Sequence, residues 1–414
     1  IIILASVLRL WNLSSNPPAL TSDEAALGYN AYSILKTARD EHGQFLPIIF
    51  KSFGDWKPGL YIYLTVPFVA AFGLNELSVR LVGALSGIIA VWLICLLASE
   101  LFKNSKLEIG TWKLGIVASF ILATLPWHIH FSRGAWEINV ALTLLLAGYY
   151  FFLKSLKSKG KHLILSALLF GLTFWTYQGA KLATNLVLLG LILIYKDEIL
   201  KLPKKIKVTA VSVLLLLLLP VVLSILQGKG GRLEVFSVFS YPPLESFINK
   251  TLSQEEYVQT KESFIYKLYH SDTLHFTKGV LGRWLNYYSP EFLFFEGDKN
   301  PRHSAPHIGQ LLLIHLPFLA LGILALSRLR TSKEGLIVWF LLLTMCLPAA
   351  LSRDSVQAVR SFNMILPVVI LLSLGAAALW DKIKSRSYVF RIRFSILVFA
   401  LYLFNFIYYL DSYW

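Results

Sequence analysis

The sequence predicts an all-α integral membrane protein of about 11 transmembrane helices, with two long outer-face loops that carry interfacial helices. Of the 414 residues, 56% are hydrophobic and only 15% are charged, and the mean hydropathy is +0.61. Apolar runs long enough to cross a hydrocarbon core of about 30 Å recur along nearly the whole chain. Lys and Arg crowd alternate connections between these runs, as the positive-inside bias of membrane proteins requires.

The first apolar run, Ile1 to Trp11, is too short to span a membrane, and we expect its helix to begin upstream of Ile1. If the apolar run Leu60 to Phe72 crossed the membrane completely, the next four Lys-rich connections would lie on the outer side of the membrane. We therefore predict that it lies in the outer interface, which suits its aromatic residues. Ten further spans are predicted near residues 77–101, 112–127, 136–153, 162–177, 182–195, 208–226, 307–326, 334–351, 361–380 and 389–410.

The positive-inside bias places the Lys- and Arg-rich connections in the cytoplasm. The other connections are then predicted to face outward, on the extracytoplasmic side of the cell inner (plasma) membrane. The net charge of +15 is mostly a topology signal with some attraction to anionic lipid, and it does not indicate nucleic-acid binding. The outward connections are residues 12–76, 128–135, 177–181, 227–306 and 352–360.

This topology divides the chain into three predicted parts. Residues 1–226 form a transmembrane module with the first outer loop at 12–76, residues 227–306 form the second long outer loop, and residues 307–414 form the C-terminal transmembrane helices. Cys95 and Cys346 both lie inside apolar runs, so we expect them to be packing residues rather than a disulfide.

The first outer loop contains several of the polar residues that look out of place. The string TSDEAALGYN places two adjacent carboxylates, Asp23 and Glu24, just after the first apolar run. Thr21 and Glu24 fit a capping box, so Glu24 is either a capping residue or a functional one. Asp23 points about 100° away around the helix and is free to face a cleft. Further along, GDWKPGLYIYL carries Asp55 and Lys57.

Three later outward segments add charged groups. PWHIHFSRGAWEIN carries Arg133 four residues before Glu137, which is also the spacing of a helical salt bridge. GDKNPRH carries Arg302 and His303, which could instead cap the start of the next span, and SRDSVQAVR ends at Arg360. Carboxylates and cations that converge at one membrane face indicate a site for an anionic group and a proton transfer.

These strings resemble membrane glycosyltransferases of the GT-C class. The DE pair after a first span, KPGLYIYL (similar to KPPLYYWL), GLNELSVRL (similar to FGxxExxxRL) and PWHIHFSRGAWEIN occur in that order within residues 1–200. The closest branch is the glycosyltransferase family 39-like one, which holds the protein O-mannosyltransferases and the lipid A aminoarabinose transferase. The resemblance implies a sugar donor carried on a polyprenyl phosphate, a first outer loop with interfacial helices, a shared seven-helix module and a further long loop.

Residue by residue, Asp23 matches the family's catalytic aspartate and Glu24 its partner. Lys57 matches the lysine of the KPPL-like string, which implies contact with the lipid phosphate. This sequence departs from the pattern at Glu137, where members commonly have Asp, and at Gly59, which replaces a second Pro. These departures leave the placement of donor and acceptor open.

We therefore predict a glycosyltransferase that moves a hexosyl or pentosyl group from a polyprenyl-phosphate donor to a hydroxyl acceptor on a protein, lipid or glycan. Transfer would occur on the outer face, with inversion at the anomeric carbon and Asp23 as the base. A transporter or flippase of lipid-linked sugars is the alternative, but the predicted spans are almost free of charge and show no internal repeat. The cations expected to stabilise the leaving phosphate are Lys57, Arg133, Arg302 and Arg360.

No cofactor is expected to be required, because these cations can neutralise one phosphate. A divalent cation is the alternative. His128 with His130, or His303 with His307, could mimic metal spacing, but no Cys or third His completes either set. The oxygen ligands for Mg²⁺ or Mn²⁺ would come from Asp23, Glu24, Asp55 and Glu137.

Overall fold

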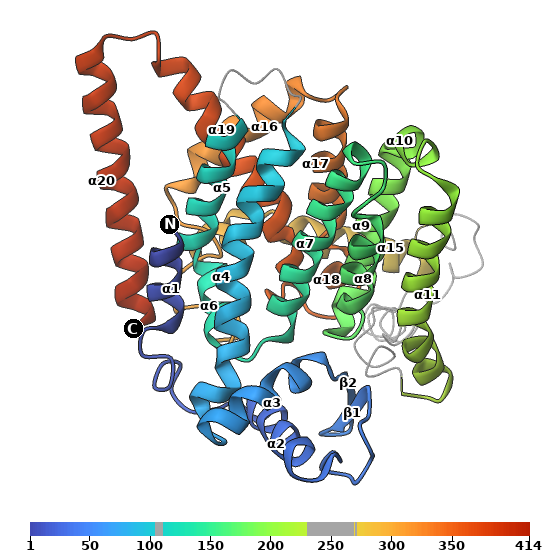
Figure 1. The fold of residues 1–414 in the computed structure, drawn as a ribbon. Helices are drawn as coiled ribbons and strands as arrows, with labels where there is room; N and C mark the ends of the chain where they lie inside the picture. Colours follow the sequence, from blue (N-terminus) through green and yellow to red (C-terminus); the bar gives the residue numbers. More distant parts are fainter. Residues whose placement is uncertain (104–110, 230–268, 270) are drawn as a thin grey trace, which may run out of the picture.

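The computed structural model describes residues 1–103, 111–229, 269 and 271–414 as a helical bundle with one two-stranded sheet (Figure 1). The sheet pairs β1 (Ile49–Ser52) with β2 (Asp55–Pro58) in antiparallel register. The helices up to residue 229 are α1 (Ile2–Leu10), α2 (Ser22–Thr37), α3 (Leu60–Phe72), α4 (Glu76–Leu101), α5 (Thr111–Thr124), α6 (Pro126–Arg133), α7 (Glu137–Lys157), α8 (Leu163–Thr173), α9 (Gln178–Ile194), α10 (Lys196–Leu200) and α11 (Lys204–Leu226). The later ones are α15 (Asp272–Asn286), the π-helical turn η2 (Glu291–Phe295), α16 (His315–Arg328), α17 (Lys333–Thr344), α18 (Leu347–Ala350), the 3₁₀ turn η3 (Phe362–Met364), α19 (Ile365–Ile383) and α20 (Tyr388–Tyr413).

The fold class predicted from composition, a bundle of apolar membrane helices, is confirmed. Among the described residues, six helical segments are long and apolar enough to cross a membrane: α4, α7, α11, α17 with α18, η3 with α19, and α20. The pair α5 and α6 adds a seventh if its 59° bend lies within one broken span. The predicted count of eleven is not confirmed, because α1, α8, α9 and α16 have only 9, 11, 17 and 14 residues. Most of the predicted second outer loop, residues 230–268 and 270, lies outside the described residues.

The connection predicted at residues 128–135 is mostly helical, which corrects the sequence interpretation. Helix α5 ends at Thr124, and α6 starts afresh at Pro126, which occupies the first turn. A residue before proline avoids the helical conformation, and Leu125 is extended at φ −72° and ψ 121°. The bend leaves carbonyls at the end of α5 without helical partners, and the buried Arg9 guanidinium donates to two of them, at Ala123 (3.1 Å) and Leu122 (3.2 Å).

The main core lies among α4, α5, α7 and α19, and η3 with α19 is the most deeply buried span. Helix α20 is the opposite case. Only Tyr402, Phe406 and Tyr409 of its 26 residues are buried, and all three lie in its C-terminal half. It stands at the side of the bundle, joined to α19 by a turn at the end away from the sheet (Figure 1).

Helices α2 and α3 and the sheet form a layer across one end of the bundle, which we call the N-terminal layer (Figure 1). Helix α3 has the bounds of the apolar run that we predicted to lie in the interface. A small core lies between this layer and α4, in which Leu27, Phe50 and Tyr61 of the layer and Val79 of α4 are buried. The layer is tied to the bundle through the Leu60 N–H, which donates to the Trp175 carbonyl (2.9 Å). Charged side chains of the layer therefore face the ends of the membrane helices.

Candidate active site

A cavity of about 260 Å³ lies between the N-terminal layer and the bundle, and polar and charged side chains form much of its wall. We call it the polar cavity. All five connections that the charge pattern assigns to one face contribute to its wall. The structure thus brings together most of the charged residues singled out in the sequence. The wall includes Asp23, Glu24, Asp55, Lys57, Trp136, Glu137, Tyr177, Gln178, His303, Gln357 and Arg360.

Strand β2 presents Asp55 and Lys57 to the polar cavity because alternate residues of a strand point to the same face. The strand turns back from β1 at Phe53 and Gly54, which both have positive φ (49° and 74°), as tight hairpin turns require. The carbonyl of Trp56, between the two charged residues, accepts from the Gln178 side chain (2.8 Å). The hairpin is therefore fixed to the start of α9 while its charges face inward.

Asp23 projects from the first turn of α2 and pairs with two cations. Its Oδ1 accepts from Lys57 Nζ, and its Oδ2 accepts from Arg302 Nη2 at 3.2 Å. The side chain remains 43% exposed. Burial raises the pKa of Asp23, but the hydrogen bonds and charges of Lys57 and Arg302 outweigh it and hold the pKa below its ordinary value. Asp23 is therefore an ionised, accessible carboxylate beside two cations.

Glu24, its neighbour, is in a different environment, because it is only 5% exposed and is held on both oxygens. Its Oε2 accepts from the Thr21 N–H (2.9 Å) while the Thr21 hydroxyl accepts from the Glu24 N–H (3.3 Å), so the predicted capping box is present. Its Oε1 accepts from Arg80 Nε (3.2 Å) and from the Ala135 N–H (3.0 Å). Glu24 lines the polar cavity, but its hydrogen bonds fix α2 against α4 and the start of α7.

The predicted contact of Arg133 with substrate is corrected, because Arg133 is fully buried away from the polar cavity. Its guanidinium donates to the carbonyls of Leu8 (3.0 Å), Trp11 (2.8 Å) and Asn16 (2.9 Å). The alternative salt bridge to Glu137 is also absent within the described chain. Gly134 ends α6 and a new helix starts at Glu137, so the two side chains are not one helical turn apart.

Arg80, which we did not single out as a site residue, acts in the same way as Arg133. It is fully buried and donates to the carbonyls of Leu13 (3.1 Å), Pro17 (2.8 Å) and Ala19 (2.7 Å), besides its bond to Glu24. Arg80 and Arg133 together donate hydrogen bonds to the backbone carbonyls of the irregular segment between α1 and α2. That backbone carries Asp23 to the polar cavity, so both arginines position the site.

Glu137 and Arg360 face the polar cavity from the bundle side. Glu137 is the half-buried first residue of α7, and no ion pair to it occurs in the described segments. Arg360 Nη1 pairs with Asp354 at 2.9 Å, and the side chain of Asp354 is 44% exposed. Burial raises the pKa of the nearby Tyr177 to about 12, so its hydroxyl stays protonated at neutral pH. This side of the cavity thus holds one carboxyl group that makes no ion pair among the described residues, one cation and a phenol.

His303 is oriented by Asp298, a residue we did not single out. Nδ1 of His303 lies 2.8 Å from Asp298 Oδ2, which also accepts from the Ala358 N–H (2.7 Å). Burial raises the pKa of Asp298, but the His303 hydrogen bond and two backbone N–H groups hold it below its ordinary value. The ring of His303 packs edge-on against Trp136, with centroids 5.5 Å apart. The alternative that Arg302 and His303 cap the next span is wrong, because α16 starts at His315.

The two departures from the family pattern, Gly59 and Glu137, can be explained in part by their surroundings. Gly59 replaces the Pro of the family pattern, and its N–H donates to the Ile48 carbonyl (2.9 Å), a bond that Pro could not make. A Cβ at this position would also lie 2.3 Å from a ring carbon of Phe50. Glu137 extends one methylene further than the Asp of other members, into the polar cavity.

The four carboxylates considered for a divalent cation all line the polar cavity, but they do not fit a metal site. Within the described residues, no group of three or more His, Cys, Asp or Glu is placed to hold a metal ion. Asp23 and Glu24 already accept from cations. His128 instead contacts Arg9 (2.7 Å), and His130 contacts the carbonyl of Arg302 (2.9 Å).

Two of the residues that we did not single out, Arg80 and Asp298, could have been recognised from the sequence. Arg80 stands in GLNELSVRL as a cation inside a predicted span, and such a charge requires a buried partner. Asp298 stands in GDKNPRH, in the same string as His303. Trp136, Tyr177, Gln178 and Gln357 carried no comparable signal, because uncharged residues next to spans are common.

Comparisons with known proteins bear on the family and the fold. The profile of the family described as dolichyl-phosphate-mannose-protein mannosyltransferase matches residues 57–224, which is less than half of the chain. No curated protein matches the sequence. The predicted resemblance to GT-C class glycosyltransferases is thus confirmed in a segment that begins at Lys57 and includes Arg80 and Glu137.

Solved structures show the same fold. The oligosaccharyltransferase of Archaeoglobus fulgidus, tethered to an acceptor peptide with an NVT sequon, has a TM-score of 0.61 at 13% identity, over 99% of this chain and 53% of that one. The same organism's AglB, with an inhibitory peptide and a dolichol-phosphate, has a TM-score of 0.61 at 12% identity, over 99% and 54%. ArnT from Cupriavidus metallidurans, bound to undecaprenyl phosphate, has a TM-score of 0.54 at 14% identity, over 96% and 62%. This chain therefore spans about half to three-fifths of the length of those proteins.

Proposed function

We propose that this protein is a membrane glycosyltransferase that moves a sugar from a polyprenyl-phosphate donor to a hydroxyl group of a protein, lipid or glycan. The observation that carries the proposal is the accessible carboxylate of Asp23. It lines the polar cavity and pairs with two cations, Lys57 and Arg302. The matching family profile and the shared fold support the proposal. Residues 1–226 would form the catalytic module, which residues 227–306 and 307–414 complete.

Asp23 would act as the general base. A hydroxyl group is a weak nucleophile at neutral pH, and transfer of its proton to a positioned carboxylate accelerates attack by about 100- to 10,000-fold. The acceptor oxygen would form a bond to the anomeric carbon on the side opposite the phosphate, and the proton would pass to Asp23. The bond between the anomeric carbon and the phosphate oxygen would break with its electron pair, so the configuration inverts.

The cations beside Asp23 would serve the leaving group. A phosphodiester becomes a phosphomonoester and gains negative charge, which prealigned cations stabilise most in a poorly hydrated site. Lys57 and Arg302 would transfer their hydrogen bonds from Asp23 to the incoming phosphate. Asp23 would then lose the interactions that lower its pKa and become a stronger base when the donor is bound. Arg360 would contact the phosphate or the sugar from the opposite wall.

The membrane would supply most of the affinity for the donor. Each buried methylene of a polyprenyl chain contributes about 0.8 kcal/mol, so the chain holds the donor in the bilayer without specific contacts. The polar cavity would lie on the extracytoplasmic side of the cell inner (plasma) membrane, because the Lys-rich connections are at the other end of the helices. Neutralisation of the phosphate by Lys57 and Arg302 makes a divalent cation dispensable.

The proposal is tested by mass spectrometry of lipid and acceptor fractions from membranes incubated with a mixture of polyprenyl-phosphate sugars. The intact protein should deplete one lipid-linked sugar and add that sugar's mass to an acceptor, whereas Asp23→Asn should do neither. Glu296→Gln is the matched control, since Glu296 is an exposed carboxylate outside the polar cavity and should keep full activity.

Two outcomes would refute parts of the proposal. Equal depletion by the intact protein and by Asp23→Asn would remove Asp23 as the base and leave Glu137 or Asp55 as candidates. Movement of a labelled lipid-linked sugar across vesicles by the intact protein, without bond cleavage, would favour a transporter or flippase instead.

A further inference from the structure

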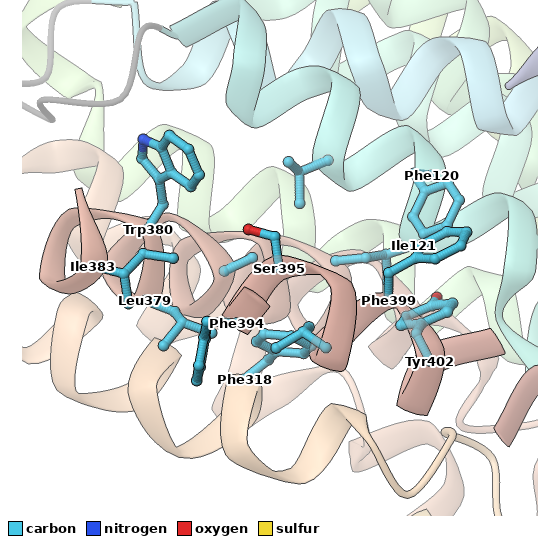
Figure 2. Close-up of a pocket in the computed structure, with 13 residues that line it drawn as sticks. Phe120, Ile121, Phe318, Leu379, Trp380, Ile383, Phe394, Ser395, Phe399 and Tyr402 are labelled. Carbon is cyan, nitrogen blue, oxygen red and sulfur yellow. The ribbon is translucent and has the colours of Figure 1, made fainter. Parts of the chain in front are cut away.

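A second, apolar groove lies at the far end of the bundle from the polar cavity. Its volume is about 270 Å³, and it runs between α20 on one side and α5, α16 and α19 on the other (Figure 2). Trp380 and Ile383 of α19 lie at one end of the groove, and Phe120 and Tyr402 lie at the other (Figure 2). None of its lining residues also lines the polar cavity.

The groove exists because α20 packs against the bundle over only half of its length. In its C-terminal half, Tyr402 joins the hydroxyl of Thr124 (2.6 Å), and Phe406 and Tyr409 are buried. From Tyr388 to Leu401 no residue is buried, although Phe394 and Phe399 face the groove. The two halves form a wedge that is closed near Tyr402 and open toward the turn between α19 and α20.

The open end of the wedge is strongly basic. Residues 381–393 hold five cations and one acid, Asp381, which pairs with Lys384 at 3.3 Å. The remaining cations form no ion pair in the described parts of the chain. Nε of Arg391 is shielded from solvent and has no hydrogen-bond partner there. The cations without an ion pair among the described residues are Lys382, Arg386, Arg391 and Arg393, of which Arg391 donates through Nη1 to the Lys384 carbonyl (3.4 Å) and lies over the Tyr388 ring (5.8 Å).

The dimensions and chemistry fit one leaflet of a lipid bilayer. From Phe394 to Tyr402 the groove follows nine residues of α20, a rise of roughly 12 Å at 1.5 Å per step, and one leaflet of hydrocarbon is roughly 15 Å thick. Trp380 lies at the end of α19, where the amphipathic ring suits the headgroup level. Basic pockets between transmembrane helices on the cytoplasmic side recognise anionic headgroups.

We infer that this groove binds an anionic glycerophospholipid of the leaflet opposite the polar cavity. One acyl chain would lie between α20 and α19 with its end near Tyr402. The phosphate would contact Arg391 at the open end, because Arg391 lies three and four residues before Phe394 and Ser395 and therefore on the groove face of α20. The bound lipid would replace the protein contacts that the N-terminal half of α20 lacks, and would fix the angle of α20 against the bundle.

The test is native mass spectrometry of the delipidated full-length protein titrated with dioleoyl phosphatidylglycerol or with dioleoyl phosphatidylcholine. We expect one retained phosphatidylglycerol, and phosphatidylcholine bound at least tenfold more weakly. Arg391→Gln should bind phosphatidylglycerol about fivefold more weakly, as expected for one charge removed, whereas Arg393→Gln, on the opposite face of α20, should change binding little. Ser395→Trp, which fills the groove from an exposed position, should abolish retention with all cations intact.

Two controls keep the result interpretable. Arg391→Lys keeps the charge and should keep most of the binding, which separates loss of recognition from loss of folding. Lys159→Gln with Lys161→Gln removes two exposed charges from another basic connection and should change nothing. Binding that survives Ser395→Trp, or that falls equally in the Lys159 and Lys161 variant, would mean diffuse attraction to a basic surface. Displacement of phosphatidylglycerol by undecaprenyl phosphate, or no retained lipid, would also overturn the inference.

Discussion

The adjacent carboxylates Asp23 and Glu24 should respond to neutralisation in opposite ways. Glu24→Gln keeps the capping box, because Gln at the third helical position can still accept from the backbone N–H of Thr21. It leaves the buried guanidinium of Arg80 without a counter-charge. Breaking a buried ion pair by removing one partner costs about 3 to 5 kcal/mol, and Arg80 keeps three carbonyl acceptors, so we expect about 3 kcal/mol.

This loss should appear as a lower melting temperature. At about 2.1 cal/mol/K per residue, unfolding of 414 residues has an entropy of about 0.9 kcal/mol/K, so 3 kcal/mol corresponds to about 3 °C. The shift should be at least that large, because membrane helices keep part of their structure on unfolding and the real entropy is smaller. Asp23→Asn removes two ion pairs, to Lys57 and to Arg302, whose shared carboxylate is 43% exposed. Each pair at such an exposed position contributes about 0 to 1 kcal/mol, so the melting temperature should move by about 2 °C or less, which is below the shift expected for Glu24→Gln.

Activity should follow the opposite order. Asp23→Asn should reduce transfer by about 100- to 10,000-fold, whereas Glu24→Gln should retain transfer when measured well below its melting temperature. The assay is thermal unfolding of the purified protein in detergent, followed by tryptophan fluorescence, alongside turnover in membranes. The double variant Glu24→Gln with Arg80→Met should lose less stability than the sum of its single variants. A Glu24→Gln protein that melts normally but has no transfer would show that Glu24 takes part in the reaction, and the reasoning from its burial would be wrong.

Three further predictions concern neighbouring residues and the metal. Lys57→Met should raise the pKa of Asp23, so the acid limb of the pH–rate profile should move to higher pH. Ionised Asp23 stabilises the fold, and this stability is lost as the pH falls through the folded-state pKa. In the variant the loss should therefore begin at a higher pH. Arg133→Met should lower the melting temperature without changing KM, because Arg133 binds backbone carbonyls, and an increased KM at unchanged stability would contradict its placement. Exhaustive chelation with EDTA should leave turnover unchanged, since no described group of ligands could hold a metal ion, and recovery by added Mg²⁺ or Mn²⁺ would contradict this.

The fold class could be predicted from the sequence because its signal is local. Apolar runs and basic connections report membrane helices without knowledge of tertiary contacts, and most predicted spans match helices within a few residues. The break at Pro126 was missed because the apolar pattern continues through it. The shortness of α8 and α16 was missed because an apolar run continues past a helix end wherever the adjoining loop is itself buried, as Leu311 and Leu312 are before α16.

The candidate site was predictable where the residues are charged and lie in outward connections, since topology alone brings those connections to one face. It was not predictable where the partner of a charge is backbone. Arg133 looked like a ligand for phosphate because an arginine beside a membrane needs acceptors, and the sequence does not reveal which acceptors are present. The structure supplies the Leu8 carbonyl in the last turn of α1 and the carbonyls of Trp11 and Asn16 in the irregular segment before α2. Where such carbonyls are buried, no water can satisfy them.

The same reasoning separates Arg133 from Arg302. A guanidinium has five N–H donors, so a fully buried arginine that donates to several carbonyls has little capacity left for a ligand. Arg133 and Arg80 each donate to three or more carbonyls and are fully buried. The side chain of Arg302 is 42% exposed and donates to a single carboxylate oxygen, so most of its donors remain free for the oxygens of a phosphate. Arg302→Gln should therefore weaken donor binding while leaving the melting temperature unchanged, and a loss of stability without a change in KM would place Arg302 with the structural arginines instead.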